Sequence, residues 1–109
     1  MPTVDERYDE AIELQQQGKL EEAVGKLTAL VAEFPDYALG HAALSVFYGK
    51  LGRHDEAVAH AKKVCELEPN DSFSFMSMSL ICQRAGRLPE AEEALGIAMR
   101  KQWAARREQ

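Results

Sequence analysis

The chain has 109 residues, 46% of them hydrophobic and 28% charged, with four prolines and one tryptophan; this composition is typical of one globular domain with a modest core and excludes extensive disorder. The net charge of -5 argues against general nucleic-acid binding, which depends on lysine and arginine neutralising phosphates. No apolar run approaches the roughly 18 to 20 residues of a membrane span, and the acidic first ten residues do not resemble a signal peptide, so we expect a cytoplasmic protein without membrane contact.

The sequence predicts three pairs of amphipathic helices, because apolar residues recur at helical intervals on either side of three glycines. The predicted helices cover residues 4–17 and 20–33, then 37–50 and 54–67, then 71–84 and 88 to about 105. Gly18, Gly52 and Gly86 separate the members of each pair, where a helix C-terminus favours a left-handed backbone conformation. Pro35 and Pro69 end the second and fourth helices, since proline disfavours the helical conformation in the residue before it.

The C-terminal segment differs from the other two in its stop signal and its charge. Trp103 stands where Pro35 and Pro69 stand in the earlier units, so we expect the last helix to run on to about Ala105 and the charged tail, residues 106–109, to fray. Residues 4–37 carry a net charge of -6, residues 38–71 carry -1 and residues 72–109 carry +2. This polarity is either drift of exposed helix faces or a preference of one end for a basic partner and of the other for an acidic one.

The helix pairs repeat with a period of 34 residues. Gly52 and Ala57 of the second unit coincide with Gly18 and Ala23 of the first when one is shifted onto the other. Small residues recur at two positions of every unit: Ala11, Ser45 and Ser79 at the first, and Ala23, Ala57 and Ala91 at the second. A fixed period near 34 is typical of a helix-turn-helix solenoid, whose units must stack to bury their apolar faces.

On these residues the chain resembles the tetratricopeptide repeat (TPR) family over nearly its whole length. In the second unit the positions of the family pattern carry His41, Leu44, Ser45, Tyr48, Ala57, Ala61 and Pro69. The resemblance implies an all-α fold, a right-handed α-solenoid of three helix-turn-helix units with six antiparallel helices and an extended last helix. We expect a single TPR domain over residues 1–109, with repeats at 4–37, 38–71 and 72–105.

Both ends of the predicted stack carry polar residues where the inner repeats carry mostly apolar ones. The replacements are Arg7, Glu10 and Glu13 in the first helix and Glu92 in the last. Because a finite solenoid must end in water, we interpret the three repeats as the complete unit. Ile97 and Met99 remain apolar, so a partner or a second copy at the C-terminal end stays open as an alternative.

Motifs for catalysis and for metal or phosphate binding are lacking in the sequence, which has no glycine-rich loop, HExxH or CxxC. His41, His54 and His60 fall on different helices or faces and are interpreted as structural. Cys65 and Cys82 are expected to be buried free thiols, with a disulfide or a metal site as the alternative. We therefore expect a non-enzymatic protein without a cofactor or a bound metal.

The family resemblance places the candidate binding surface in the concave groove, which the first helix of each repeat lines. Carried over by position, the candidate partner-binding residues are Tyr8, Ile12, Leu39, Ala42, Val46, Lys50, Phe73, Met76, Leu80 and Arg84. Their apolar stripe is too large to leave in water without a reason, unless part of it belongs to the core. A trough of about 20 to 25 Å would admit about seven extended residues or a helix of about four turns.

The sequence therefore predicts a scaffold or adaptor that binds an apolar peptide or helix of a protein partner. The alternative is a homodimer that associates through the groove or the last helix. A third hypothesis is contact with an anionic membrane or nucleic acid through the basic end. The preference for cations at helix C-termini explains these basic residues equally well. The basic end comprises Arg100, Lys101, Trp103, Arg106 and Arg107.

One activity of the family is predicted to be absent. Many three-repeat members grip the C-terminal carboxylate of a chaperone with lysine, asparagine and arginine side chains. The matching positions here hold Tyr8, Ile12, Ala43, Phe73 and Ser77. None of these side chains can pair with a carboxylate in a charge-assisted way, so we expect no chaperone-tail clamp.

Overall fold

The computed structural model describes residues 1–107, which form six α-helices and no β-strand in that range. The helices are α1 (Val4–Gln16), α2 (Leu20–Glu33), α3 (Ala38–Lys50), α4 (His54–Leu67), α5 (Ser72–Arg84) and α6 (Leu88–Arg107). Each bound lies within two residues of its prediction, as is normal for the ends of helices. None of the six helices is both long and apolar enough to cross a membrane.

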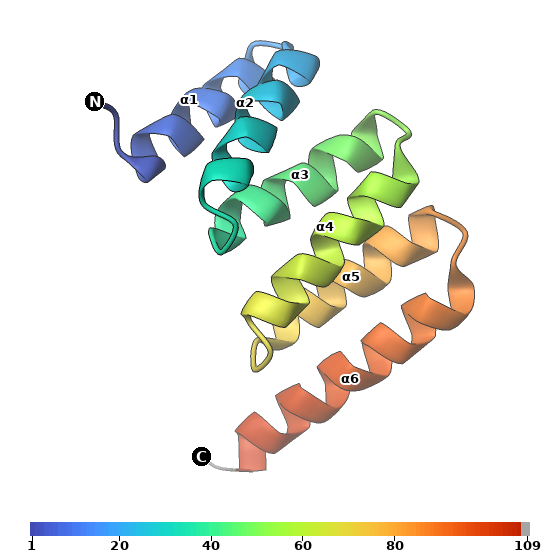
Figure 1. Cartoon of the computed structure of the whole chain (residues 1–109). Coiled ribbons are helices and arrows are strands. Elements are labelled where there is room, and N and C mark those ends of the chain that lie inside the picture. Colours follow the sequence, from blue (N-terminus) through green and yellow to red (C-terminus); the bar gives the residue numbers. More distant parts are fainter. Residues whose placement is uncertain (108–109) are drawn as a thin grey trace.

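Consecutive helices pack against one another and form one stack, with the N-terminus and α6 at opposite ends (Figure 1). The stack is elongated, with principal extents of 44 × 32 × 22 Å. The first helices of the second and third pairs, α3 and α5, also contact each other and so lie side by side. This arrangement confirms the predicted helical solenoid of three helix-turn-helix units.

The turn within each pair has the same geometry three times. The φ angles are +82° at Gly18, +76° at Gly52 and +78° at Gly86. In the second turn the N–H of Gly52 donates to the carbonyl of Gly49 at 3.1 Å, and the N–H of Arg53 donates to the carbonyl of Tyr48 at 2.9 Å. These two bonds satisfy carbonyl groups at the helix C-terminus and require a left-handed residue between them, which confirms the role predicted for the glycines.

Side-chain caps fix the start of α1 and of α5. The hydroxyl of Thr3 accepts a hydrogen bond from the N–H of Glu6 at 3.1 Å, and the carboxylate of Glu6 accepts one from the N–H of Thr3 at 3.3 Å. At α5 the carboxylate of Asp71 accepts a hydrogen bond from the N–H of Phe73 at 3.0 Å. Each cap satisfies backbone donors that the helix itself leaves without a partner.

The last helix extends two residues beyond its predicted end at Ala105. Arg106 and Arg107 continue it, because arginine has a high helix propensity and its charge is favourable near the negative end of the helix dipole. The rest of the tail that was predicted to fray, residues 108–109, lies outside the described residues.

The core is concentrated between the helices of the first two repeats. The largest fully buried side chains are Leu27, Leu30, Leu44, Val58 and Cys82. At the other end of the stack, α6 buries three alanines, Ala91, Ala94 and Ala98. The large apolar side chains of the third repeat therefore lie mostly near the surface.

Two of the polar residues predicted to cap the N-terminal end also form ion pairs with the neighbouring helix. A guanidinium nitrogen of Arg7 lies 2.7 Å from a carboxylate oxygen of Glu33, and the Lys26 ammonium lies 2.9 Å from the carboxylate of Glu10. All four side chains are at least partly exposed, so each pair contributes about 0 to 1 kcal/mol. The polar residues that face water at this end thus also connect α1 to α2.

Candidate functional site

The apolar stripe predicted for the concave groove is accessible to solvent. The exposed fraction of its large side chains ranges from 38% for Val46 to 79% for Phe73, and Leu39, Met76 and Leu80 lie between these values. None of the five belongs to the buried core. The alternative interpretation, that these side chains are core residues, is therefore not supported.

The candidate residues of the first repeat differ from those of the other two. Tyr8 and Ile12 are half-buried and pack against the core. The ring of Tyr8 meets that of Tyr37 edge to face, with centroids 6.0 Å apart, and the Tyr37 hydroxyl donates to the carboxylate of Asp5 at 3.1 Å. Burial and this hydrogen bond raise the pKa of Tyr37 to about 12. The candidate residues of the first repeat therefore take part in the packing of α1 against the start of α3, and less of their surface is available to a partner.

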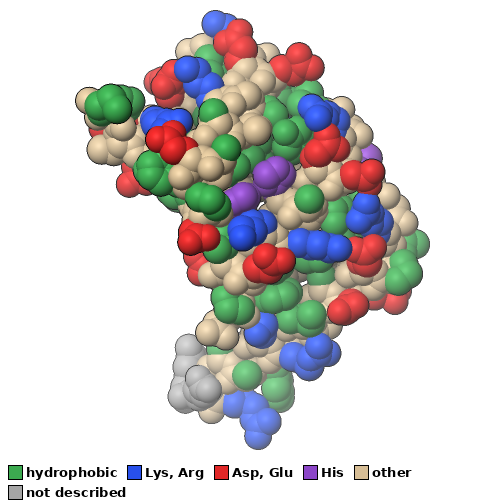
Figure 2. All heavy atoms as spheres, viewed as in Figure 1, with side chains coloured by type: hydrophobic (Ala, Val, Ile, Leu, Met, Phe, Trp, Pro, Cys, Tyr) green, Lys and Arg blue, Asp and Glu red, His purple; other side chains and the backbone are tan. Residues whose placement is uncertain are grey.

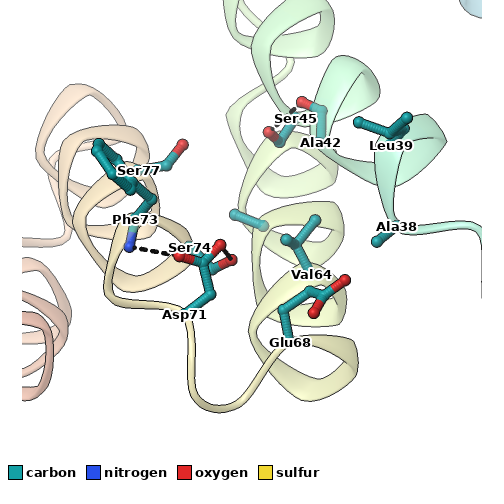
Figure 3. Close-up of a pocket in the computed structure, with 11 residues that line it drawn as sticks. Ala38, Leu39, Ala42, Ser45, Val64, Glu68, Asp71, Phe73, Ser74 and Ser77 are labelled. Atoms are coloured by element: carbon teal, nitrogen blue, oxygen red, sulfur yellow. Dashed lines mark hydrogen bonds between the residues drawn. The ribbon is translucent and has the colours of Figure 1, made fainter. Parts of the chain in front are cut away.

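A pocket of about 420 Å³ lies between α3, α4 and α5 (Figure 3). Small residues of α3 and α4 form part of its wall and leave the space open, while Leu39 and Phe73 stand on the two sides. Its lining comprises Ala38, Leu39, Ala42, Ser45, Ala61, Val64, Glu68, Asp71, Phe73, Ser74 and Ser77. We call it the central pocket.

Most polar groups of the central pocket already have partners within the chain. The hydroxyl of Ser45 donates to the carbonyl of Ala42 at 2.7 Å, and that of Ser74 donates to the carboxylate of Asp71 at 3.0 Å. Because these hydrogen bonds satisfy the polar atoms, the wall presents a mainly apolar surface to a ligand. The exposed carboxylate of Glu68 remains available for a donor or a cation.

A second hollow of about 450 Å³ lies one repeat further along, and we call it the end pocket. Phe73, Met76 and Leu80 of α5 line it, together with Leu95 of α6. Phe73 takes the place that Leu39 has in the central pocket, since the two residues are one repeat of 34 residues apart. Phe73 thus stands between two hollows of the same kind.

The structure brings together part of the predicted site. Five of the ten candidate residues line a pocket: Leu39 and Ala42 line the central pocket, Met76 and Leu80 line the end pocket, and Phe73 lines both. Tyr8, Ile12, Val46, Lys50 and Arg84 line neither pocket. Sequence reasoning missed Ala61, Val64 and Glu68, because the family pattern assigned the groove to the first helix of each repeat, whereas the first two residues lie in α4 and Glu68 is the residue that follows it.

Two histidines that the sequence placed on different helices or faces are in contact between α3 and α4. The Nδ1 atoms of His41 and His60 lie 3.0 Å apart, and Nε2 of His41 lies 2.8 Å from the carbonyl oxygen of Pro35. Since a carbonyl can only accept, Nε2 of His41 carries the proton, and Nδ1 of His41 accepts from His60. Burial and the neighbouring His41 lower the pKa of His60 below its ordinary value of 6.5. The histidine contact is a structural link between two helices and the preceding loop.

The two cysteines are free and buried, as predicted. Sγ of Cys65 lies 3.4 Å from the carbonyl oxygen of Ser74 and 3.6 Å from Sδ of Met78. Burial raises the pKa of the Cys65 thiol to about 11 and also raises that of Cys82, so both thiols stay protonated and unreactive. Across residues 1–107, no three histidine, cysteine or acidic side chains converge on a point where a metal ion could be held.

A family model described as "Tetratricopeptide repeat" matches residues 8–72, which is more than half of the chain. The chain belongs to the tetratricopeptide repeat family. The match covers most of the first TPR unit and all of the second. The third unit lies beyond it and is assigned from the 34-residue spacing and from the repeated turn geometry at Gly86.

Several solved structures share this TPR fold. MamA has 20% sequence identity and a TM-score of 0.86 over 96% of this chain and 61% of its own. The second TPR of Spaghetti (RPAP3) bound to HSP90 peptide SRMEEVD has 22% identity and a TM-score of 0.77 over 88% of this chain and 89% of its own. YrrB, described as a TPR protein with an unusual peptide-binding site, has 20% identity and a TM-score of 0.81 over 94% of this chain and 53% of its own.

At these identities the likeness shows the fold alone. This chain spans about six-tenths of the MamA chain and about half of the YrrB chain. A search of curated protein sequences gave no match.

Proposed function

We propose that this TPR chain is a non-enzymatic interaction scaffold that binds an apolar segment of a partner protein in its concave groove. The observation that carries the proposal is the position of Phe73, a side chain 79% exposed that stands between the central pocket and the end pocket. A large aromatic side chain in water beside two hollows is typical of a binding surface rather than of a core.

The two pockets favour a partner with two apolar side chains. Full burial of one leucine or phenylalanine side chain contributes about 1.5 to 3 kcal/mol, so two anchors supply a large part of the energy of a moderate complex. A peptide in the polyproline II conformation advances about 3.1 Å per residue with three residues per turn, so side chains three residues apart share one face, and neighbouring helices lie about 8 to 10 Å apart. Anchors three residues apart therefore match one step from pocket to pocket.

Charged residues at the edges of the groove favour one orientation of the partner. Glu68 lines the central pocket near the start of α5, whereas Lys50 and Arg84 stand at the C-terminal ends of α3 and α5. A cationic group beside the first anchor would approach Glu68, and an acidic group on the other side would approach Lys50 or Arg84. Such exposed charges act mainly on the association rate and its salt dependence.

Proteins of the same fold support peptide binding as the general mode. YrrB is described as having a peptide-binding site, and the RPAP3 domain is bound to an HSP90 peptide. The groove of the present chain is built differently from a carboxylate clamp, since Ile12, Ala43 and Phe73 stand at positions where that clamp needs charged or amide side chains. We therefore propose an internal apolar segment as the ligand, not a chaperone tail.

A library of random 12-residue peptides displayed on phage tests the proposal with purified protein. We expect enrichment of peptides that carry two apolar residues near three positions apart, and we expect Phe73→Ala to weaken the selected peptides at least tenfold. Leu88→Ala is the matched control, because Leu88 is also an exposed large apolar residue but lines neither pocket.

Ala42→Leu adds a second test, because the larger side chain fills the central pocket without removing any apolar surface. It should weaken the selected peptides as strongly as Phe73→Ala does, while Lys50→Glu should change affinity less than threefold and mainly at low salt. Peptides that bind Phe73→Ala and Ala42→Leu as tightly as the unchanged protein would show that the groove is not the binding site.

A further inference from the structure

The outer face of α6 carries a second exposed apolar stripe, which meets the groove only at Leu95, a residue that also lines the end pocket. Leu95, Met99 and Trp103 are spaced four residues apart, so they lie on one face of the helix, and their exposed fractions are 42%, 59% and 62%. One repeat earlier, the positions of Leu95 and Met99 hold Ala61 and Cys65, which are buried where α4 packs against α5. The stripe thus occupies the face that contacts another helix elsewhere in the stack.

Opposite charges bound this stripe at equal distances from its centre. Glu92 precedes Met99 by seven residues and Arg106 follows it by seven, which is two helical turns in each direction and keeps both on the same face. Neither side chain forms an ion pair with another residue of the range 1–107. From the N-terminal end of the helix, this face carries an acidic residue, three large apolar residues and a basic residue, in the order Glu92, Leu95, Met99, Trp103 and Arg106.

We propose that a second copy of this chain covers the stripe, with the two α6 helices crossing antiparallel and Met99 on the two-fold axis. Leu95 of each copy then packs on Trp103 of the other, and each Glu92 lies opposite an Arg106. A parallel arrangement would set glutamate against glutamate and arginine against arginine, so the order of charges selects the antiparallel pair. An isologous contact of this kind closes as a dimer and does not extend into filaments.

The dimer covers Leu95 at the edge of the end pocket but uses no residue of the central pocket, so it goes beyond the proposed function. The stripe from Glu92 to Arg106 spans 15 residues, which is about 22 Å of helix and forms a small interface compared with those of permanent complexes. We therefore expect a weak dimer that forms at high protein concentration. Two grooves in one particle bind a partner with two apolar segments more tightly than one groove does.

Figure 2 shows hydrophobic and basic side chains together at the C-terminal end of the molecule, as this contact requires.

Cysteine cross-linking tests the geometry of the proposed dimer. In the dimer Met99 of one copy faces Met99 of the other, whereas Leu88 lies beyond the overlap. Leu88 is 56% exposed against 59% for Met99, so the pair is matched in accessibility. Under mild oxidation Met99→Cys should form a disulfide-linked dimer, and Leu88→Cys should remain monomeric. Native Cys65 and Cys82 are buried and give little background.

Cross-linking of both variants to the same extent, or of neither, would overturn the proposal. A parallel pair cross-links both variants, and an α6 face covered by another protein cross-links neither.

Charge reversal provides an independent test by sedimentation equilibrium up to about 1 mM protein. Glu92→Arg and Arg106→Glu should each raise the dissociation constant of the dimer at least fivefold, and the double variant should return it to within twofold of the original value. At micromolar protein concentration, where the chain is monomeric, binding of the phage-selected peptides should stay unchanged in all three, which separates a failure of the dimer from a failure of the groove. A protein that is monomeric at 1 mM, or a double variant that does not recover, contradicts the proposal.

Discussion

The first two repeats bury most of their large apolar side chains, whereas the third repeat exposes most of its own. Leu27, Leu30 and Leu44 are fully inaccessible to solvent, while Phe73 is largely exposed and α6 buries three alanines. Burial of one large apolar side chain stabilises the fold by about 1.5 to 3 kcal/mol. The difference indicates that stability is concentrated in the first two repeats, and the proposed binding uses the apolar surface that the third repeat exposes.

The connection between the second and third repeats explains how the third can stay folded with a small core. Ile81 and Cys82 of α5 are buried, and the side chain of Arg87 forms an ion pair with Asp55 across the two repeats. Because each unit of a solenoid contacts only its neighbours, the third repeat depends on the surface that α4 offers to α5. Changes in the second repeat should therefore affect the whole chain, and changes on the outer face of the third should not.

The largest expected effect is at Leu44. Leu44→Ala removes a fully buried side chain and should lower the free energy of unfolding by about 2 to 5 kcal/mol in urea denaturation. Leu80→Ala is the matched change in the third repeat, and because Leu80 is exposed it should cost less than about 1 kcal/mol. Equal losses for the two variants would remove the distinction between the repeats.

The next effect concerns the turn of the second repeat. Gly52 has a φ of +76°, so Gly52→Val should destabilise the protein by at least about 1 kcal/mol, measured as a shift of the urea midpoint. Gly25→Ala is the control, because Gly25 lies in the interior of α2 and an added Cβ would meet no atom within 4 Å. That change should stabilise by about 0.5 to 1 kcal/mol. An unchanged urea midpoint for Gly52→Val would argue against a left-handed backbone conformation at this turn.

A smaller effect is expected from pH, through the histidine contact of the second repeat. The pKa of His60 is lowered below 6.5 in the folded protein, so the unfolded chain binds this proton more readily. The stability that neutral His60 contributes to the folded protein is fully present above about pH 6.5. It is lost as the pH falls through the lower pKa of the folded state. His60→Gln keeps a donor for His41 but cannot become charged, and it should flatten the loss of thermal stability between pH 7 and pH 5. The same slope in both proteins would show that His60 does not titrate in this way.

The fold could be predicted from the sequence because each helix carries its own local signals. Gly18 and Gly52 mark turns, Pro35 and Pro69 mark the ends of second helices, and these features repeat at a fixed spacing. The 34-residue period also specifies how the pairs stack, since equivalent residues must make equivalent contacts. Where the stop signal is missing, after Trp103, the helix continues two residues past the predicted end at about Ala105.

The site was less predictable, because side-chain contacts depend on how far each helix rotates against its neighbours. The contact of His41 with His60 joins two helices, and the two residues are 19 positions apart in the sequence. No short sequence motif indicates a contact at that spacing. Glu68 lines the central pocket from the C-terminal cap of α4, although the family pattern assigns the groove to first helices. In contrast, the exposure of Phe73 agrees with its position on a first helix, and its role in binding stays a prediction.

The free energy of unfolding of the double variant Phe73→Ala with Met76→Ala tests the central claim most directly. If these side chains serve binding rather than the core, the free energy of unfolding of the double variant in urea should fall by less than about 1 kcal/mol. The double variant should nevertheless no longer bind the phage-selected peptides. A loss of about 2 to 5 kcal/mol, comparable to that expected for Leu44→Ala, would show that the two side chains belong to the core and would contradict the account.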